Sequence, residues 1–163
     1  MLWSKLLLAA STLTSVFAQN AHVATTPKAP GLTYLYSSNV TLGTTIDYGT
    51  GPKGSRVAIP ITGGTFSGPK LKGTIINLGA DWGVTDSLGV FNPDTRYGLR
   101  TDDGANIYIQ TSGPSQSDGK IHLRIVFETG NANYTWLNEI VAVGILSAGT
   151  GYVAIDAWQL NSP

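Results

Sequence analysis

A carboxyl group and an indole stand side by side in a chain that is otherwise poor in charge. Only 12% of the residues are charged, and Asp81 directly precedes Trp82. A carboxyl group held against an indole in a pocket of low polarity would have a raised pKa, which suits it to general acid–base catalysis. The alternative interpretation is a turn aspartate followed by a core tryptophan.

A second group of polar side chains depends on the register of a predicted hairpin. If 102–104 (Asp-Asp-Gly) is a three-residue loop with Gly104 in the left-handed conformation, Thr101 pairs with Ala105. Leucine, isoleucine and Tyr97 side chains then share one face. A loop shorter by one residue would mix the faces, so the three-residue loop is favoured. The opposite face collects the candidate ligand-binding residues Arg96, Arg100, Tyr108 and Gln110 and the candidate catalytic acid Asp94.

The polar face of this hairpin has two interpretations. An arginine beside a tyrosine can orient a carbonyl or carboxylate ligand, and Asp94 and Arg96 lie about 7 Å apart along the strand. A solvent-exposed ion pair between the same two residues would contribute little to stability. Both interpretations stay open at this point.

A third group follows later in the chain. Glu128 ends a strand-like segment, and Trp136 and Asn138 come soon after. At the mouth of a barrel, Glu128 would be a third candidate catalytic carboxyl, Trp136 a stacking surface and Asn138 an oriented hydrogen-bonding group. The alternative is a strand-end acid and an aromatic plug beneath a loop.

The composition excludes several classes of protein. The chain has no cysteine, which excludes disulfides, thiolate metal sites and a cysteine nucleophile. His22 falls in the N-terminal leader, so His122 is the single histidine of the predicted domain and a two-histidine metal site is excluded. No Gly-x-Ser-x-Gly elbow and no phosphate-binding loop occur. We expect no metal and no cofactor.

Net charge and charge distribution limit the partners. The formal net charge is zero, and the ten basic residues do not cluster. Nucleic acid and anionic membranes are therefore not expected partners. The partner that we expect is a small organic ligand. Self-association into a homo-oligomer is compatible with the sequence.

The N-terminus has the pattern of a secretory signal. Lys5 precedes an apolar stretch, and Val16-Phe17-Ala18 ends in a small residue suited to cleavage, so we expect a signal peptide over 1–18 and no membrane insertion after its removal. A flexible leader over 19–31 and one domain over 32–163 follow. The sequons at Asn39 and Asn133 are candidate glycosylation sites of a secreted or vesicular protein.

The mature chain reads as strands almost throughout. Segments rich in Val, Ile, Thr and Tyr end at Gly, Pro, Asp or Asn, which favours a single antiparallel barrel or sandwich of about eight to ten strands. Only 135–140 suggests a short helical turn. The later strands are predicted to place Val141, Val143 and Ile145 on the apolar face that also carries Ile155. The strand-like segments are 32–37, 43–48, 55–62, 70–77, 94–101, 105–111, 120–129, 139–147 and 151–160.

Six ordered motifs resemble one known family. They are Pro-Ile-Thr-Gly-Gly-Thr-Phe-Ser-Gly-Pro-Lys-Leu-Lys-Gly (60–73), Ala-Asp-Trp (80–82), Asp-Thr-Arg-Tyr (94–97), Arg-Thr-Asp-Asp-Gly-Ala (100–105), Phe-Glu-Thr-Gly (127–130) and Trp-Leu-Asn (136–138). Together they resemble the domain of unknown function 3237, also called uncharacterised family 0311. The resemblance implies a small all-β barrel and no settled activity. The family's glycine pair before Ala-Asp-Trp is Leu78-Gly79 here.

Two functions are compatible with these observations. One is a small barrel that holds an organic molecule and acts as a cofactor-free cyclase or isomerase of secondary metabolism. The other is a non-catalytic secreted protein that binds a ligand or a host molecule.

Overall fold

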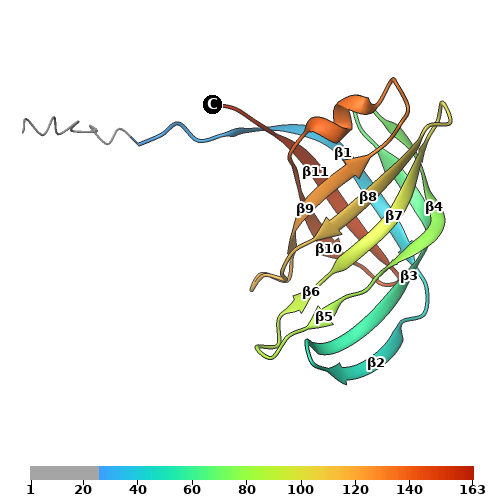
Figure 1. The fold of residues 1–163 in the computed structure, drawn as a ribbon, viewed down its shortest axis with the longest axis vertical. Coiled ribbons are helices and arrows are strands. Elements are labelled where there is room, and N and C mark those ends of the chain that lie inside the picture. Colours follow the sequence, from blue (N-terminus) through green and yellow to red (C-terminus); the bar gives the residue numbers. More distant parts are fainter. Residues whose placement is uncertain (1–25) are drawn as a thin grey trace, which may run out of the picture.

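The computed structural model describes residues 26–163 of the chain, shown in Figure 1. The predicted signal peptide and residues 19–25 of the leader lie outside the described residues. Residues 26–163 contain eleven strands and one short 3-10 helix. The strands are β1 (Gly31–Leu42), β2 (Ile46–Gly51), β3 (Gly54–Ser67), β4 (Lys72–Asp81), β5 (Val84–Thr85), β6 (Phe91–Asn92), β7 (Asp94–Thr101), β8 (Asn106–Ser112), β9 (Ile121–Glu128), β10 (Ala142–Ala148) and β11 (Tyr152–Asn161).

Eight of these strands form a closed antiparallel barrel. Their order is β1-β11-β10-β9-β8-β7-β4-β3, and pairing between β3 and β1 closes the ring. Each barrel strand is antiparallel to both neighbours. Closure leaves none of the eight with an unpaired edge, which satisfies the backbone groups without a second sheet. The predicted barrel is confirmed, and the sandwich alternative is wrong.

The two ends of the barrel differ. The first half of β3 extends past one end and carries β2 and β5, with β6 beyond β5, at the lower end in Figure 1. The other end holds η1 (Thr135–Glu139), the predicted helical turn, whose Leu137 is 1% exposed and belongs to the core. Within the described residues no helix is long and apolar enough to cross a membrane.

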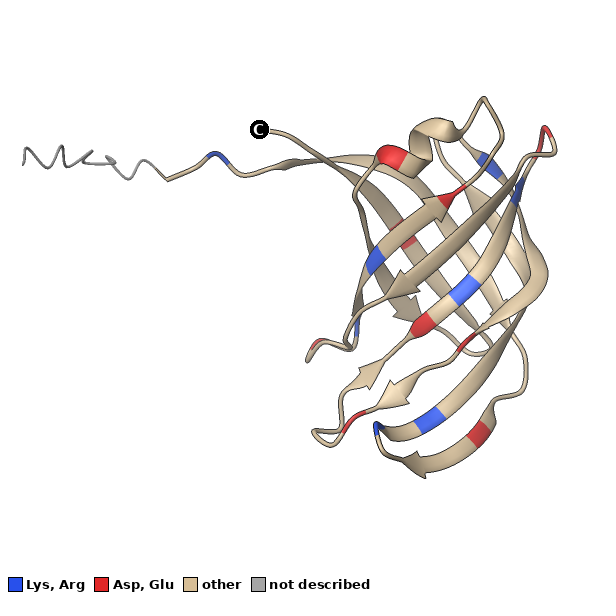
Figure 2. Ribbon diagram, viewed as in Figure 1, with Lys and Arg blue, Asp and Glu red and all other residues tan. Residues whose placement is uncertain are grey.

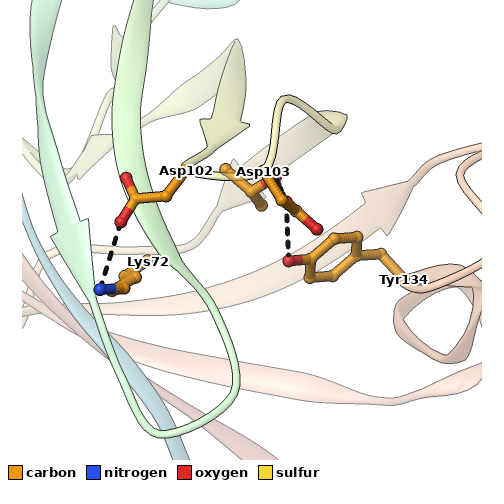
Figure 3. A network of polar contacts seen from close by, with 5 residues as sticks. Lys72, Asp102, Asp103 and Tyr134 are labelled. Atoms are coloured by element: carbon orange, nitrogen blue, oxygen red, sulfur yellow. Dashed lines mark hydrogen bonds and ion pairs between the residues drawn. The ribbon is translucent and has the colours of Figure 1, made fainter.

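A polar network ties three segments together beside the η1 end (Figure 3). Lys72 Nζ lies 3.4 Å from Asp102 Oδ2, and the Tyr134 hydroxyl donates a hydrogen bond of 3.0 Å to Asp103 Oδ1. Asp103 also accepts a short hydrogen bond from Thr101, and that bond holds the pKa of its carboxyl below the ordinary value. Lys72, Asp102 and Asp103 are exposed, so their ion pair and hydrogen bonds orient the turn and contribute little to stability.

The predicted hairpin register is confirmed. Arg96 faces Gln110 and Leu99 faces Ile107, with Gly104 in the loop at φ +90°. Tyr97, Leu99, Ile107 and Ile109 are all buried in the barrel core. The opposite, polar face of β7 and β8 therefore points outward.

The prediction for β10 is wrong, because its inward side is the side of small residues. Ala142 and Gly144 are buried, whereas Val141 is 63% exposed and Val143 pairs opposite Trp158 on the outside. A Cβ on Gly144 would lie 2.8 Å from the Ile125 Cδ1 atom. The bulky Ile125 side chain therefore takes the interior space that a larger β10 residue would need.

Candidate functional site

A cavity opens inside the barrel at the end away from η1. Its volume is about 270 Å³. Most of its lining is apolar and comes from β1, β3, β10 and β11, including Leu42, Ile61 and Val153. Phe91 of β6 and Tyr152 at the start of β11 also line it. We call this the mouth cavity.

The mouth cavity has one carboxyl group in its lining, that of Asp81. Asp81 ends β4, and its Oδ1 atom accepts a hydrogen bond of 2.8 Å from the backbone N–H of Asp94. Burial raises the pKa of this carboxyl, and the nearby Asp94 charge adds to that effect, while hydrogen bonds from the Asp94 backbone and the Thr95 side chain act against it. Asp81 therefore keeps its proton to a higher pH than an exposed aspartate does.

An irregularity in β4 places Asp81 opposite Thr95. The pairing of β4 with β7 shifts register between Ile75 and Gly79, and Gly79 has a φ of +115°. A Cβ there would lie 2.2 Å from the Arg96 carbonyl oxygen, so only glycine fits. Leu78 has no positive φ, and therefore replaces the family's first glycine without strain.

Polar side chains extend from Asp81 around the inner wall. Asp81 pairs in register with Thr95, and Thr95 pairs with Thr111, which puts three polar residues in one row. Both threonines are buried and line the mouth cavity. Tyr97, two residues along β7, also lines the cavity, and its hydroxyl is buried without a hydrogen-bond partner.

Sequence reasoning missed Thr95, Tyr97 and Thr111. It placed Tyr97 on the apolar face as a core residue, which is correct, but gave its hydroxyl no role. The available signal was that Thr95 and Thr111 continue the inward alternation of β7 and β8 as polar residues near the strand ends.

Most of the other candidate residues meet on the outside of the barrel. An open groove of about 720 Å³ crosses β4, β7, β8 and the end of β9. We call it the outer groove. Gly98 forms part of its floor, beside Ile76. Its lining includes the predicted residues Trp82, Arg96, Arg100, Tyr108 and Glu128.

The charges of the outer groove are largely solvated. Arg96 Nη1 lies 3.0 Å from Asp94 Oδ1, and both side chains are nearly half exposed. Arg100 Nε donates a hydrogen bond of 3.0 Å to Asn106 Oδ1. Gln110 faces Arg96 in register but does not line the groove. Figure 2 shows acidic and basic positions spread over the barrel strands and turns rather than gathered in one patch.

Two candidates lie at the η1 end and line neither the mouth cavity nor the outer groove. Asn138 brackets the backbone of Thr129, accepting from its N–H and donating to its carbonyl, both at 2.9 Å. Trp136 packs against the core, and Lys70 Nζ lies 5.2 Å from its ring centroid. These contacts fasten η1 to the end of β9.

The remaining candidates concern modification and metals. Asn39 and Asn133 are both exposed, Asn39 within β1 and Asn133 in the turn before η1. Among residues 26–163, no group of three or more His, Asp or Glu side chains is arranged to hold a metal ion.

Comparison with known proteins agrees with the fold and the motifs. A β-barrel-like protein from Acinetobacter baumannii superposes with a TM-score of 0.78 at 39% identity, covering 83% of this chain and 98% of that one. An uncharacterised protein of Rhodopseudomonas palustris superposes with a TM-score of 0.77 at 26% identity, covering 82% and 99%.

A fungal relative carries a functional name. The hydroalkoxylation enzyme of Penicillium herquei is 28% identical over 135 residues, which cover 83% of this chain and 87% of the relative. The crystal structure of an enzyme from the same fungus superposes with a TM-score of 0.74 at 27% identity, covering 85% of this chain and all of that one. The model of the family described as "Protein of unknown function (DUF3237)" matches residues 30–122, more than half of the chain, and the protein therefore belongs to that family.

Proposed function

We propose that the protein binds a neutral organic molecule in the mouth cavity and catalyses its cyclisation without a cofactor, with Asp81 as the acid–base group. The observation that carries the proposal is a carboxyl group, its pKa raised by burial, in the wall of a mostly apolar cavity. Such groups serve general acid–base catalysis because a carboxyl group with a raised pKa is a stronger base than an exposed one and can return the proton that it accepts. No Lys, Arg or His lines the cavity, which favours an uncharged substrate.

The name of the Penicillium herquei relative supports an addition reaction. Hydroalkoxylation adds an O–H group across a carbon–carbon double bond. In an intramolecular case the Asp81 carboxylate accepts the hydroxyl proton as the C–O bond forms and the C=C π bond breaks. The resulting carboxylic acid then returns the proton to the neighbouring carbon. Substrate and product are isomers, and no electron acceptor or donor is consumed.

The cavity contributes more than the carboxyl group. Its apolar walls, which include Leu42 and Val153, exclude water and hold a flexible precursor in a folded conformer. Bringing a hydroxyl and an alkene together in this way removes much of the entropic part of the barrier. The proposed reaction is a cyclisation of secondary metabolism that needs a carboxyl group and an apolar cavity but no cofactor.

Deleting the gene and profiling metabolites tests the proposal without a known substrate. We expect an uncyclised isomer of the product to accumulate, with the same mass and a different retention time. Wild type and Arg96→Ala should restore the product, because Arg96 lies in the outer groove, whereas Asp81→Asn should not. Rescue by Asp81→Asn and failure of Arg96→Ala would move the site to the outer groove. An unchanged profile would leave the non-catalytic ligand-binding function.

We also propose that the protein is secreted, from the signal-like pattern over 1–18. Mass spectrometry of the protein from culture medium should find an N-terminus at Gln19 and glycan on Asn133. Retention of Met1 in a protein found inside the cell would contradict secretion.

A further inference from the structure

Two tyrosine hydroxyls are buried in the barrel without a partner. The hydroxyls of Tyr36 and Tyr97 are the buried side-chain polar atoms of the described residues that lack a hydrogen bond. Leaving a buried hydroxyl unsatisfied lowers stability, so such groups are rare in folded proteins. A hydroxyl kept at this cost inside a cavity is a group placed to meet a ligand.

The two phenols differ in their access to the mouth cavity. Tyr97 lines it, two residues along β7 from Thr95, the register partner of Asp81. Tyr36 does not line it and packs edge-on against Phe66 and Phe127, with ring centroids 5.7 Å and 6.2 Å away. Of the two phenols, Tyr97 is thus the one that belongs to a residue lining the mouth cavity.

The protonation state of Tyr97 defines what it can do. Burial raises the pKa of its phenol further above the already high ordinary value. The hydroxyl therefore stays protonated at physiological pH and serves as a donor, not as a base. A ligand that satisfies it must present an acceptor oxygen, and the absence of cations in the lining makes a neutral carbonyl a better match than a carboxylate.

We propose that Tyr97 donates a hydrogen bond to the carbonyl oxygen of the ligand, and that the substrates are neutral hydroxyl-bearing compounds whose reacting double bond is conjugated to that carbonyl. This inference rests on the proposed function. The hydroxyl oxygen adds to the distal alkene carbon, and its proton passes to Asp81. Negative charge then moves onto the carbonyl oxygen, where Tyr97 stabilises it. Return of the proton to the carbon next to the carbonyl completes a balanced isomerisation.

A matched pair of probes isolates the carbonyl contact. We would measure binding of 9-fluorenone and fluorene, which share one ring system and differ in the carbonyl, to the wild type, Tyr97→Phe and Tyr36→Phe. The wild type and Tyr36→Phe should bind 9-fluorenone about tenfold more tightly than fluorene, the value of one net hydrogen bond. In Tyr97→Phe the preference should vanish while the affinity for fluorene is unchanged. Only the wild type and Tyr36→Phe should lower the carbonyl stretching frequency of bound 9-fluorenone.

Each contrary outcome is informative. Equal affinities for the two probes in the wild type, no binding of either probe, or a preference that survives Tyr97→Phe would overturn the inference. Thermal unfolding separates these results from misfolding, since removal of an unsatisfied hydroxyl should leave the melting temperature unchanged or raised. In the deletion strain, failure of Asp81→Asn with full rescue by Tyr97→Phe would reject this inference and keep the proposed function. Full rescue by both variants would reject the proposed function itself.

Discussion

At the scale of single residues, the proposed function depends on the side chains of Asp81 and Tyr97. One is a carboxyl group whose pKa is raised by burial, and the other is a buried donor without a partner. Both groups are unfavourable for stability and both line the mouth cavity. Function commonly keeps such groups at binding sites although they lower stability.

Asp81→Asn should stabilise the protein at neutral pH while abolishing the proposed reaction. Folding raises the pKa of Asp81, so its contribution to stability is complete below the unfolded pKa of about 3.9 and is lost as pH rises through the folded pKa. Asparagine imitates the protonated form at every pH. Urea unfolding should therefore show a gain in stability at pH 7 that is absent near pH 3. A loss of stability at pH 7 would contradict the raised pKa.

At the scale of elements, the sequence predicted the orientation of the strands whose large apolar side chains face inward and failed at β10, where small residues face inward. The register of β7 and β8 followed from one loop, because a shift of one residue would have mixed leucines with arginines. In β10 the small Ala142 and Gly144 face inward because Ile125 fills the space, and no local pattern in β10 reveals this. Tertiary packing therefore determined which face of β10 points into the barrel.

The β7–β8 loop gives a direct test of this register. Gly104→Val should lower stability by about 1–3 kcal/mol, because a β-branched residue resists the positive φ of +90°. Gly130→Val is the matched control: a Cβ at either site meets nothing within 4 Å, and Gly130 lacks the positive φ. Urea unfolding with unchanged slope should separate the two variants. Equal midpoints would mean that backbone strain at Gly104 is negligible.

The irregularity in β4 should be more sensitive still. Gly79→Ala places a Cβ 2.2 Å from the Arg96 carbonyl oxygen at a positive φ, and we expect a loss of about 2–4 kcal/mol. Ligand affinity should fall as well, since the irregularity sets Asp81 opposite Thr95. Gly51→Ala, with open space and no positive φ, should do neither. A stable Gly79→Ala variant with full activity would show that the irregularity does not position the carboxyl group.

At the scale of the whole molecule, closure of the barrel separates an apolar interior from a polar exterior. The candidate face with Arg96 and Tyr108 was identified correctly as one surface, but the sequence did not tell which side of the sheet lines the interior. A small barrel fills its interior with apolar side chains, so the polar face lies outside and forms the outer groove. Only Asp81 of the predicted catalytic carboxyls reaches the mouth cavity.

The 3-10 helix η1 should be important for stability and unimportant for ligand binding in the mouth cavity. Leu137→Ala at the closed end should lower stability by about 2–5 kcal/mol, the usual range for a buried leucine. Leu88→Ala, at a site 86% exposed, should change it by less than about 0.5 kcal/mol. The affinity of folded Leu137→Ala for 9-fluorenone should match that of the wild type, because the mouth cavity lies at the other end. A selective loss of affinity would indicate that the ends are coupled.

Methyl NMR of the wild type titrated with 9-fluorenone tests the central claim, that the mouth cavity holds the ligand, most directly. Inside the barrel the mouth cavity presents the methyl groups of Ile59, Ile61 and Val153, and outside it the outer groove presents those of Ile76 and Leu78. We predict ligand-induced shifts and intermolecular contacts for the first three residues and none for the last two. Contacts confined to Ile76 and Leu78 would contradict the account and place the site on the outer groove.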